Sequence, residues 1–288
     1  MTKSTVVLDY FGALVADDEG LPLTEAALSL AQDAYPQLDV QAALADIDGL
    51  VDKLRRRLPK QAGAAQKLHL LNRYFFRELG FASNRYDYYD PDNSHLNAVL
   101  HKRHGIPISL AVLYLEMAQQ LGLKVSGVSF PGHFMLRATL PAGEVIMDPT
   151  TGDSLSESQL MEMLEPYMIS AGQPVASALR AILQPATARE VVARMLRNLK
   201  MIYLQTEQWP LLLAVQQRLA ILLPQNIEER RDRGLAFARV DAYRPAIADL
   251  QAYLEERPAS EDATIIETQL TDLRQRAGER RGDGEARL

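Results

Sequence analysis

The spacing of apolar side chains predicts that the first part of the chain is helical. Thr24 is followed by Leu28 and Ala31, spaced to lie on one face of a helix, and a second helical stripe continues from there to about residue 60. A third helix fits residues 62–79, where leucines and aromatic residues recur at helical spacing. We expect residues 1–61 to form a helical region that packs on the domain after it.

The helical period continues beyond a turn-rich connector. Residues 95–104 fit a helix that Asn93 or Ser94 is placed to cap, and Gly105 is placed to end it in a left-handed conformation. Residues 107–122 fit a further helix, because proline suits the first turn. These two helices lead directly into a segment with a different period.

After residue 122 the apolar period changes from that of a helix to that of a strand. Three strands are predicted, over residues 123–130, 133–140 and 144–148. A capping box of Ser156 with Gln159 then opens a short helix that we expect to end near Pro166. Helices followed by antiparallel strands predict an α+β core over residues 62–166.

The C-terminal third reads as all-helical with an internal repeat. The proline-rich residues 167–186 are interpreted as a linker, and Thr187 with Glu190 forms a capping box at the start of residues 187–277. The 34-residue spacing that is typical of tetratricopeptide repeats separates three pairs of residues, namely Trp209 and Tyr243, Ala214 and Ala248, and Pro224 and Pro258. Residues 278–288 lack an apolar face and are expected to be disordered.

Composition narrows the possible functions. The chain has 288 residues, of which 47% are apolar and 24% charged, as in ordinary globular proteins. A net charge of −6 argues against broad binding to nucleic acid, and the absence of cysteine excludes disulfides and any cysteine nucleophile. The sequence shows neither a secretory signal nor an apolar membrane span, so we expect a soluble cytoplasmic protein.

Three residues have the chemistry of a nucleophile, a base and a group that orients the base. Ser109 lies in the first turn of the helix over 107–122, His133 opens the second strand, and Asp148 closes the third. Neighbouring strands can bring His133 and Asp148 together, and the helix can point Ser109 toward the histidine. Each residue also has a structural interpretation, as a first-turn serine, a partly buried histidine and a turn aspartate.

Two groups of acidic or histidine residues could suggest a metal site, but neither has a complete set of ligands. Asp87, Asp90 and Asp92 lack the glycine and glutamate of a calcium loop, and a capped turn is preferred. His101 and His104 lack a third ligand, so a solvated helix end is preferred. We therefore expect no metal and no cofactor. The turn-rich segment before residue 95 contains three tyrosines, Tyr86, Tyr88 and Tyr89. We interpret them as residues that pack around the rim of a cleft near Ser109, His133 and Asp148.

The segments GIPISLAVLYLEMAQQLGLKVSGVSFPGHFMLRA and VIMDP resemble the transglutaminase-like core, a papain-like fold. The match is closer to a bacterial group described as regulators of sirC expression, which join such a core to tetratricopeptide repeats. The resemblance implies that Ser109 stands at the position of the catalytic cysteine, with His133 and Asp148 as its histidine and aspartate. It also leads us to expect an aromatic residue where Thr150 stands.

The serine at this position decides the expected function. A helix N-terminus and an imidazolium can lower the pKa of a thiol far enough to ionise it, whereas a hydroxyl needs a base that removes its proton during attack. We expect a non-catalytic, regulatory protein that binds a protein or peptide through its repeats and cleft, with no nucleic-acid or membrane partner. The alternatives are an amide or ester hydrolase that uses Ser109, His133 and Asp148, and a cleft that binds a ligand without turnover.

Overall fold

The computed structural model describes residues 3–84, 87, 89–169 and 175–285. The contacts divide the chain into two compact units. The core unit comprises Asp17–Met195, and the C-terminal unit comprises Met1–Ala16 together with Leu196–Leu288. Each unit is described by itself. Within the described part of the chain, no helix is both long enough and apolar enough to cross a membrane.

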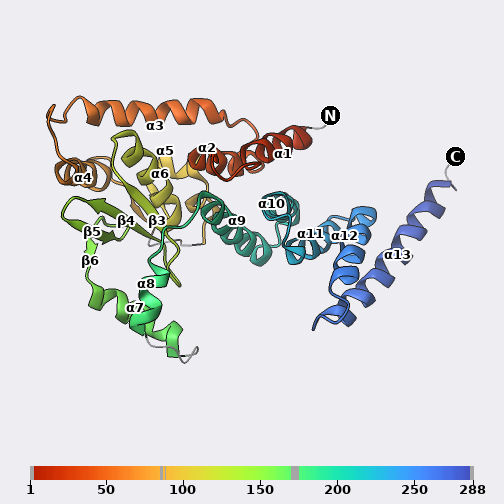
Figure 1. The fold of residues 1–288 in the computed structure, drawn as a ribbon. Helices are drawn as coiled ribbons and strands as arrows, with labels where there is room; N and C mark the ends of the chain where they lie inside the picture. The colour runs from red at the N-terminus through yellow and green to blue at the C-terminus, as the bar shows by residue number, and fades with distance from the viewer. Residues whose placement is uncertain (1–2, 85–86, 88, 170–174, 286–288) are drawn as a thin grey trace. The chain divides into compact units, whose positions relative to one another are not determined.

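The core unit contains helices on both sides of a small antiparallel sheet (Figure 1). Its α-helices are α2 (Leu23–Ser29), α3 (Val40–Arg55), α4 (Ala64–Asn72), α5 (Leu96–Lys102), α6 (Pro107–Gln120), α7 (Glu157–Ile169), α8 (Val175–Ile182) and the start of α9 (Ala188–Gln205). It also contains two 3₁₀-helices, η1 (Leu30–Gln32) and η3 (Pro91–Asn93), and a π-helix, η2 (Arg73–Glu78).

The sheet has the order β3-β4-β5-β6 and is antiparallel throughout. The strands are β3 (Val125–Val128), β4 (Met135–Leu140), β5 (Gly143–Met147) and β6 (Ser154–Leu155). Leu136 of β4 is paired with Met147 of β5, and the following pair is Arg137 with Ile146. Because successive side chains alternate between faces, the sheet has two different apolar surfaces.

The two faces of the sheet are covered by different helices. On one face, Met135 and Ile146 pack with Leu160 and Leu164 of α7 and with Leu179 of α8. On the other face, α6 contacts β3 and β4, and α2, α3 and α5 contact α6 in turn. The central helix α6 is therefore buried on most of its surface, which explains why its sequence is apolar almost all round. A second, two-stranded parallel sheet pairs β1 (Ala82–Ser83) with β2 (His104–Gly105).

The C-terminal unit is all-helical. It consists of α1 (Lys3–Leu14), the end of α9, α10 (Trp209–Leu222), α11 (Ile227–Arg239), α12 (Tyr243–Glu256) and α13 (Ala263–Glu285). Helices α10 to α13 pack in sequence, each against the next. Helix α1 packs on α10, where Phe11 is fully buried and lies near the guanidinium of Arg218, with 5.7 Å between the ring centroid and Cζ.

The backbone repeats with the same 34-residue period as the sequence. Glu207 and Asp241 both adopt left-handed conformations, with φ values of 54° and 57°. Leu223 and Arg257 end α10 and α12 with almost identical φ and ψ angles. The backbone therefore repeats at the start and end of α10 and α12, with the spacing that the sequence predicts.

The unit boundaries differ from those expected at three places. The first 16 residues belong to the C-terminal unit, whereas residues 1–61 were expected to pack on the core. Helices α7 and α8 occupy most of the expected linker over 167–186, because α8 carries an apolar face that packs on the sheet; residues 170–174 lie outside the described residues. Helix α13 continues to Glu285, so 278–285 are helical, and 286–288 are not described.

Three local predictions are also wrong. Asn93 and Ser94 do not cap α5, because its N-cap residue is His95 and Asn93 belongs to η3. Gly105 does not end α5, because Arg103 adopts the left-handed conformation there, with φ 63°, and Gly105 joins β2. Helix α7 continues past Pro166 to Ile169. The capping boxes at Ser156 and Thr187 are confirmed by their hydrogen bonds to Gln159 and Glu190.

Candidate functional site

Ser109 is fully buried at the start of α6, and its hydroxyl bonds only to the backbone. Its Oγ donates to the carbonyl of Asn93 at 2.6 Å, and it lies 3.0 Å from the carbonyl of Ile106. The N–H of Ile106 donates to the same Oγ at 3.1 Å. The side chain therefore caps its own helix and ties α6 to the turn before α5.

The space around the Ser109 hydroxyl is limited by a glycine. A methyl group built at Gly105 would lie 2.6 Å from Ser109 Oγ and 3.0 Å from a side-chain carbon of Val99. Glycine is therefore needed at position 105 because its backbone lies so close to the serine side chain. A left-handed backbone conformation is not the reason, since Gly105 does not have a positive φ. The Oγ atom also lies 2.6 Å from the carbonyl oxygen of Asn93, a distance that suits an O–H donor.

His133 and Asp148 lie side by side, as expected for two positions near the ends of neighbouring strands. His133 precedes β4 and Asp148 follows β5. The Nε2 atom of His133 is 3.3 Å from Oδ2 of Asp148, and about a fifth to a quarter of each side chain is exposed. The pair is therefore accessible to solvent, in contrast to Ser109.

Thr150 supports the carboxylate of Asp148 from the other side. Both its backbone N–H, at 2.7 Å, and its hydroxyl, at 2.6 Å, donate to Oδ1 of Asp148. Burial raises the pKa of Asp148, but the hydrogen bonds from His133 and Thr150 outweigh that effect and hold the pKa below its usual value. Asp148 is therefore ionised at neutral pH. Thr150 stands where the family resemblance leads us to expect an aromatic residue, and here it acts as a hydrogen-bond donor.

The loop that carries His133 is held by an arginine of α9. The guanidinium of Arg194 donates to the carbonyl of Phe130 at 3.1 Å and to that of His133 at 2.7 Å, and it lies over the ring of Phe134. Gly132 in the same loop has φ 67°, and a side chain there would collide with Tyr167. The backbone position of His133 is thus fixed by its neighbours.

The three predicted site residues do not form a connected triad. In the described part of the chain, the hydrogen bonds of Ser109 Oγ are to Asn93 and Ile106, and none is to His133. A serine nucleophile needs a base that accepts its proton, and the proton of Ser109 is already directed to a backbone carbonyl. The structure brings together the base and its orienting group, with the serine hydroxyl turned away from them.

The other predicted groupings are structural. Asp90 accepts from the backbone N–H of Asp92 at 2.9 Å, as expected for a capped turn, and Asp92 pairs with Tyr35 and Lys102. Nδ1 of His104 lies 2.8 Å from the carbonyl of Lys102. Among the described residues, no cluster of three or more histidine or acidic side chains could hold a metal. Tyr86 and Tyr88 lie outside the described residues.

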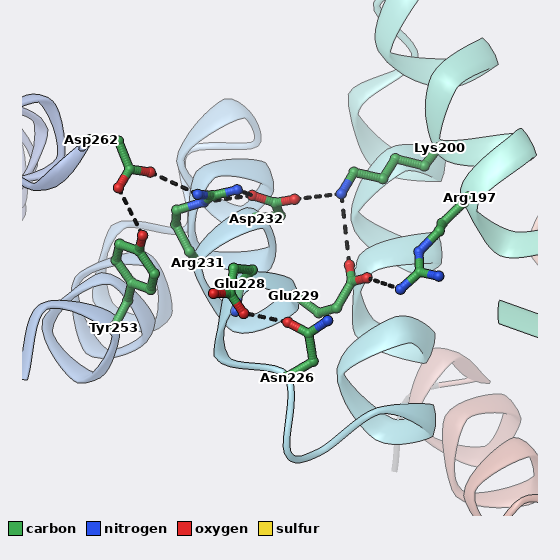
Figure 2. A network of polar contacts seen from close by, with 9 residues as sticks. All are labelled: Arg197, Lys200, Asn226, Glu228, Glu229, Arg231, Asp232, Tyr253 and Asp262. Carbon is green, nitrogen blue, oxygen red and sulfur yellow. Dashed lines mark hydrogen bonds and ion pairs between the residues drawn. The ribbon is translucent and has the colours of Figure 1, made fainter. Parts of the chain in front are cut away.

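Charged side chains link three helices of the C-terminal unit (Figure 2). Arg197 of α9 pairs with the buried Glu229 of α11 at 3.0 Å, and Lys200 of α9 reaches both Glu229 and Asp232. On the other side of α11, Arg231 pairs with Asp262, which also accepts from the hydroxyl of Tyr253 at 2.7 Å. This network, drawn in Figure 2, fixes how α9, α11 and α12 pack.

The sequence did not predict the roles of four residues that shape the site: Asn93, Gly105, Thr150 and Arg194. The motif PGHF and the segment MDPT drew attention only to the residues with catalytic chemistry. The one available signal was Thr150, because a hydroxyl two residues after an aspartate commonly closes a local turn. The roles of the other three depend on contacts between segments far apart in the sequence.

Comparisons with known protein families agree with this division of the chain. A family model described as "Transglutaminase-like superfamily" matches residues 41–197, which is more than half of the chain. A second model, described as "Tetratricopeptide repeat", matches residues 199–271, where the structure has the repeated helical pairs. The chain therefore belongs to the transglutaminase-like superfamily.

Similar bacterial proteins align with this chain over most of their own length. A "UPF0162 protein" of Xylella fastidiosa is 38% identical over 258 residues, which cover 89% of this chain and 92% of the relative. The "UPF0162 protein YchA" of Escherichia coli (strain K12) is 30% identical over 84% of this chain and 86% of its own. "Protein SirB1" of Salmonella typhimurium is 29% identical over 79% of this chain and 84% of its own. These relatives share both the core and the repeats.

Proposed function

We propose that this chain is a non-catalytic member of its superfamily that acts by binding a protein or peptide. The observation that carries the proposal is the buried hydroxyl of Ser109, whose proton is directed to the carbonyl of Asn93. A nucleophile must reach substrate, and this side chain has no exposed surface. Ser109 then serves as a helix cap at the position where an enzyme of this fold would carry its nucleophile.

The C-terminal unit supports the binding part of the proposal. Stacked tetratricopeptide-type helical pairs present a concave surface that suits a peptide or a helix. The acidic net charge favours protein contacts over nucleic acid. A regulatory role like the one the family resemblance suggests would operate through such contacts, and the partly exposed His133–Asp148 pair offers polar groups on the core unit.

The proposal is tested by hydrolysis assays with activated esters and amides as substrates. The wild-type protein and Ser109→Ala are expected to give the same low background rate, because the hydroxyl takes no part in chemistry. His133→Ala is the matched control, since it removes the imidazole that lies 3.3 Å from the carboxylate of Asp148. A rate that falls on Ser109→Ala in a folded protein would contradict the proposal.

A second candidate is an amide or ester hydrolase that uses Ser109 as nucleophile, His133 as base and Asp148 as orienting group. The observation that favours it is the intact pair of His133 with an ionised Asp148. Such an enzyme requires Ser109 to leave its backbone partners and turn toward His133. The two candidates are separated by the hydrolysis rate of Ser109→Ala, which falls below that of the wild-type protein only if Ser109 is the nucleophile.

A further inference from the structure

A pocket of about 410 Å³ lies within the C-terminal unit, apart from the site on the core. Side chains of α9, α10, α11 and α13 line it, and six of the fourteen lining residues are leucine or alanine. Leu204 on the α9 side is a large apolar residue that is 45% exposed. A hollow with exposed apolar side chains indicates a binding site.

Most of the charges in this pocket are already neutralised by partners within the protein. Lys200 pairs with Asp232 and Glu229, a contact visible at the right of the network in Figure 2. Arg276 pairs with Asp272 at 2.9 Å. The two lining carboxylates therefore each have a cationic partner, and neither is left to attract a basic ligand.

Arg239 is the exception among the cations that line the pocket. In the described part of the chain it has no ion pair, and its guanidinium lies over the face of Trp209, with 4.7 Å from Cζ to the ring centroid. The indole holds the guanidinium plane in place and leaves its N–H groups available. A carboxylate is the group that such a fixed guanidinium binds best.

Gln216 gives a second, independent sign of a missing ligand. Its side chain is only 1% exposed, it lines the pocket, and its Oε1 is buried with no hydrogen-bond partner among the described residues. A buried amide oxygen without a partner destabilises the free protein, because its hydrogen bonds to water are lost and not replaced. A ligand that offers an N–H group or a hydroxyl would satisfy it.

We propose that the C-terminal pocket binds a peptide segment that places a carboxylate on Arg239 beside a leucine-like side chain, with its backbone amide bonded to Gln216. This inference rests on the proposed binding function and names the chemistry of the partner. An acidic peptide fits better than a nucleotide, because Arg239 already covers the face of Trp209 on which a base would stack. The apolar walls also exceed what a small inorganic anion would use.

The test selects from a displayed library of random peptides on the full-length protein. The enriched peptides are expected to carry an aspartate or glutamate within two positions of leucine, methionine or phenylalanine. On Arg239→Glu the same selection is expected to exchange the acidic position for lysine or arginine. Arg244→Glu is the matched control, because Arg244 is exposed on the same unit and does not line the pocket, and it should leave the selection unchanged.

The strongest enriched peptide is then measured by fluorescence polarisation. Arg239→Glu and Gln216→Leu are each expected to weaken binding by roughly tenfold or more, and added salt should weaken binding to the wild-type protein. Circular dichroism and thermal unfolding check that both variants are folded. Failure to enrich any acidic peptide, affinity that is indifferent to both substitutions, or equal competition by inorganic phosphate would overturn the inference.

The outcome is independent of the chemistry at Ser109. If Ser109 proved catalytic but the acidic preference and its reversal on Arg239→Glu were found, the proposed function would fail and the pocket inference would stand. If Ser109 proved inert and no peptide depended on Arg239, the pocket inference alone would fail.

Discussion

At the scale of single residues, the site is defined by the directions in which two hydroxyl groups point. Ser109 donates to a backbone carbonyl, and Thr150 donates to the carboxylate of Asp148. One hydroxyl is committed to holding two helices together, and the other to keeping an aspartate ionised. A hydroxyl group therefore stabilises the packing of two segments at Ser109 and the charge of a carboxylate at Thr150.

Restoring a thiol at position 109 is expected to damage the fold without creating an enzyme. The sulfur of Ser109→Cys is larger than the oxygen that lies 2.6 Å from the carbonyl of Asn93, so its buried neighbours must shift and the free energy of unfolding should fall by about 1–3 kcal/mol. Ser109→Ala should cost only about 1 kcal/mol, the value of a lost hydrogen bond. Urea denaturation measures both, with the exposed Ser129→Ala as control. A cysteine variant as stable as wild type and reactive with iodoacetamide would contradict this.

The hydroxyl of Thr150 is expected to make stability depend on pH. The folded pKa of Asp148 lies below its unfolded value, so its contribution to stability is complete above about pH 4 and is lost as the pH falls through the folded pKa. Thr150→Val should therefore lower the free energy of unfolding by about 1 kcal/mol at neutral pH. The difference should shrink below about pH 4.

Denaturation curves at several pH values check this prediction. The matched control is Thr139→Val, because Thr139 is an exposed threonine of β4. A difference between wild type and Thr150→Val that stays constant from neutral to acidic pH would show that the hydroxyl does not act through the charge of Asp148.

Local signals predicted some of these residue positions well and others not at all. The alternating strands and the short turn between them predicted that His133 and Asp148 would be neighbours, since antiparallel pairing fixes which positions meet. The direction of the Ser109 hydroxyl could not be predicted, because its partner Asn93 is 16 positions away in sequence. Gly105 was interpreted as a helix end when its role is to leave room for Ser109 Oγ.

At the scale of elements, the two helical pairs have the same backbone conformation at positions that are 34 residues apart. The left-handed residues Glu207 and Asp241 stand at equivalent places, directly before α10 and α12. A residue with a side chain is strained there relative to glycine, by about 1–2 kcal/mol. The two sites differ because Asp241 Oδ1 accepts from the hydroxyl of Tyr243 at 2.8 Å.

Glycine is therefore expected to stabilise the first turn more than the second. Glu207→Gly should raise the free energy of unfolding by up to about 1 kcal/mol, after allowing for the greater freedom of glycine in the unfolded chain. Asp241→Gly should gain less, because it loses the hydrogen bond from Tyr243. Thermal unfolding measures both, with Glu207→Ala as the control. Equal effects of the two glycine variants would contradict the assignment.

Elements whose burial depends on distant partners were the ones that the sequence misplaced. Prolines and a glycine favoured a linker over 167–186, but Leu179 of α8 packs into the apolar cluster on the sheet. Helix α13 was expected to stop before 278, although it continues to Glu285. For α8 the packing that decides the structure comes from segments elsewhere in the chain.

At the scale of the whole molecule, the C-terminal unit is discontinuous in sequence. The chain begins in this unit with α1, continues through the core unit, and returns to the C-terminal unit within α9. Tetratricopeptide-type arrays expose apolar surface at their ends, and α1 packs on α10 with the buried Phe11 beside Arg218. No local pattern could identify this partner, because α1 carries only a weak amphipathic period.

Removing the Phe11 ring is expected to destabilise the C-terminal unit selectively. Phe11→Ala should cost about 3–5 kcal/mol, as for other buried aromatic side chains. Hydrogen exchange followed by mass spectrometry should then show faster exchange in α10 and α11, with α6 and the strands unchanged. The exposed Val6→Ala serves as the control. Faster exchange in the core unit alone would show that α1 belongs there.

The central claim is that Ser109 is a buried structural residue and not a nucleophile, and covalent labelling tests it most directly. The native protein is treated with a fluorophosphonate probe, beside a known serine hydrolase, and its intact mass is measured. We predict no adduct on the wild-type protein and the same result for Ser109→Ala. A single adduct that maps to Ser109 and disappears in Ser109→Ala would contradict the account.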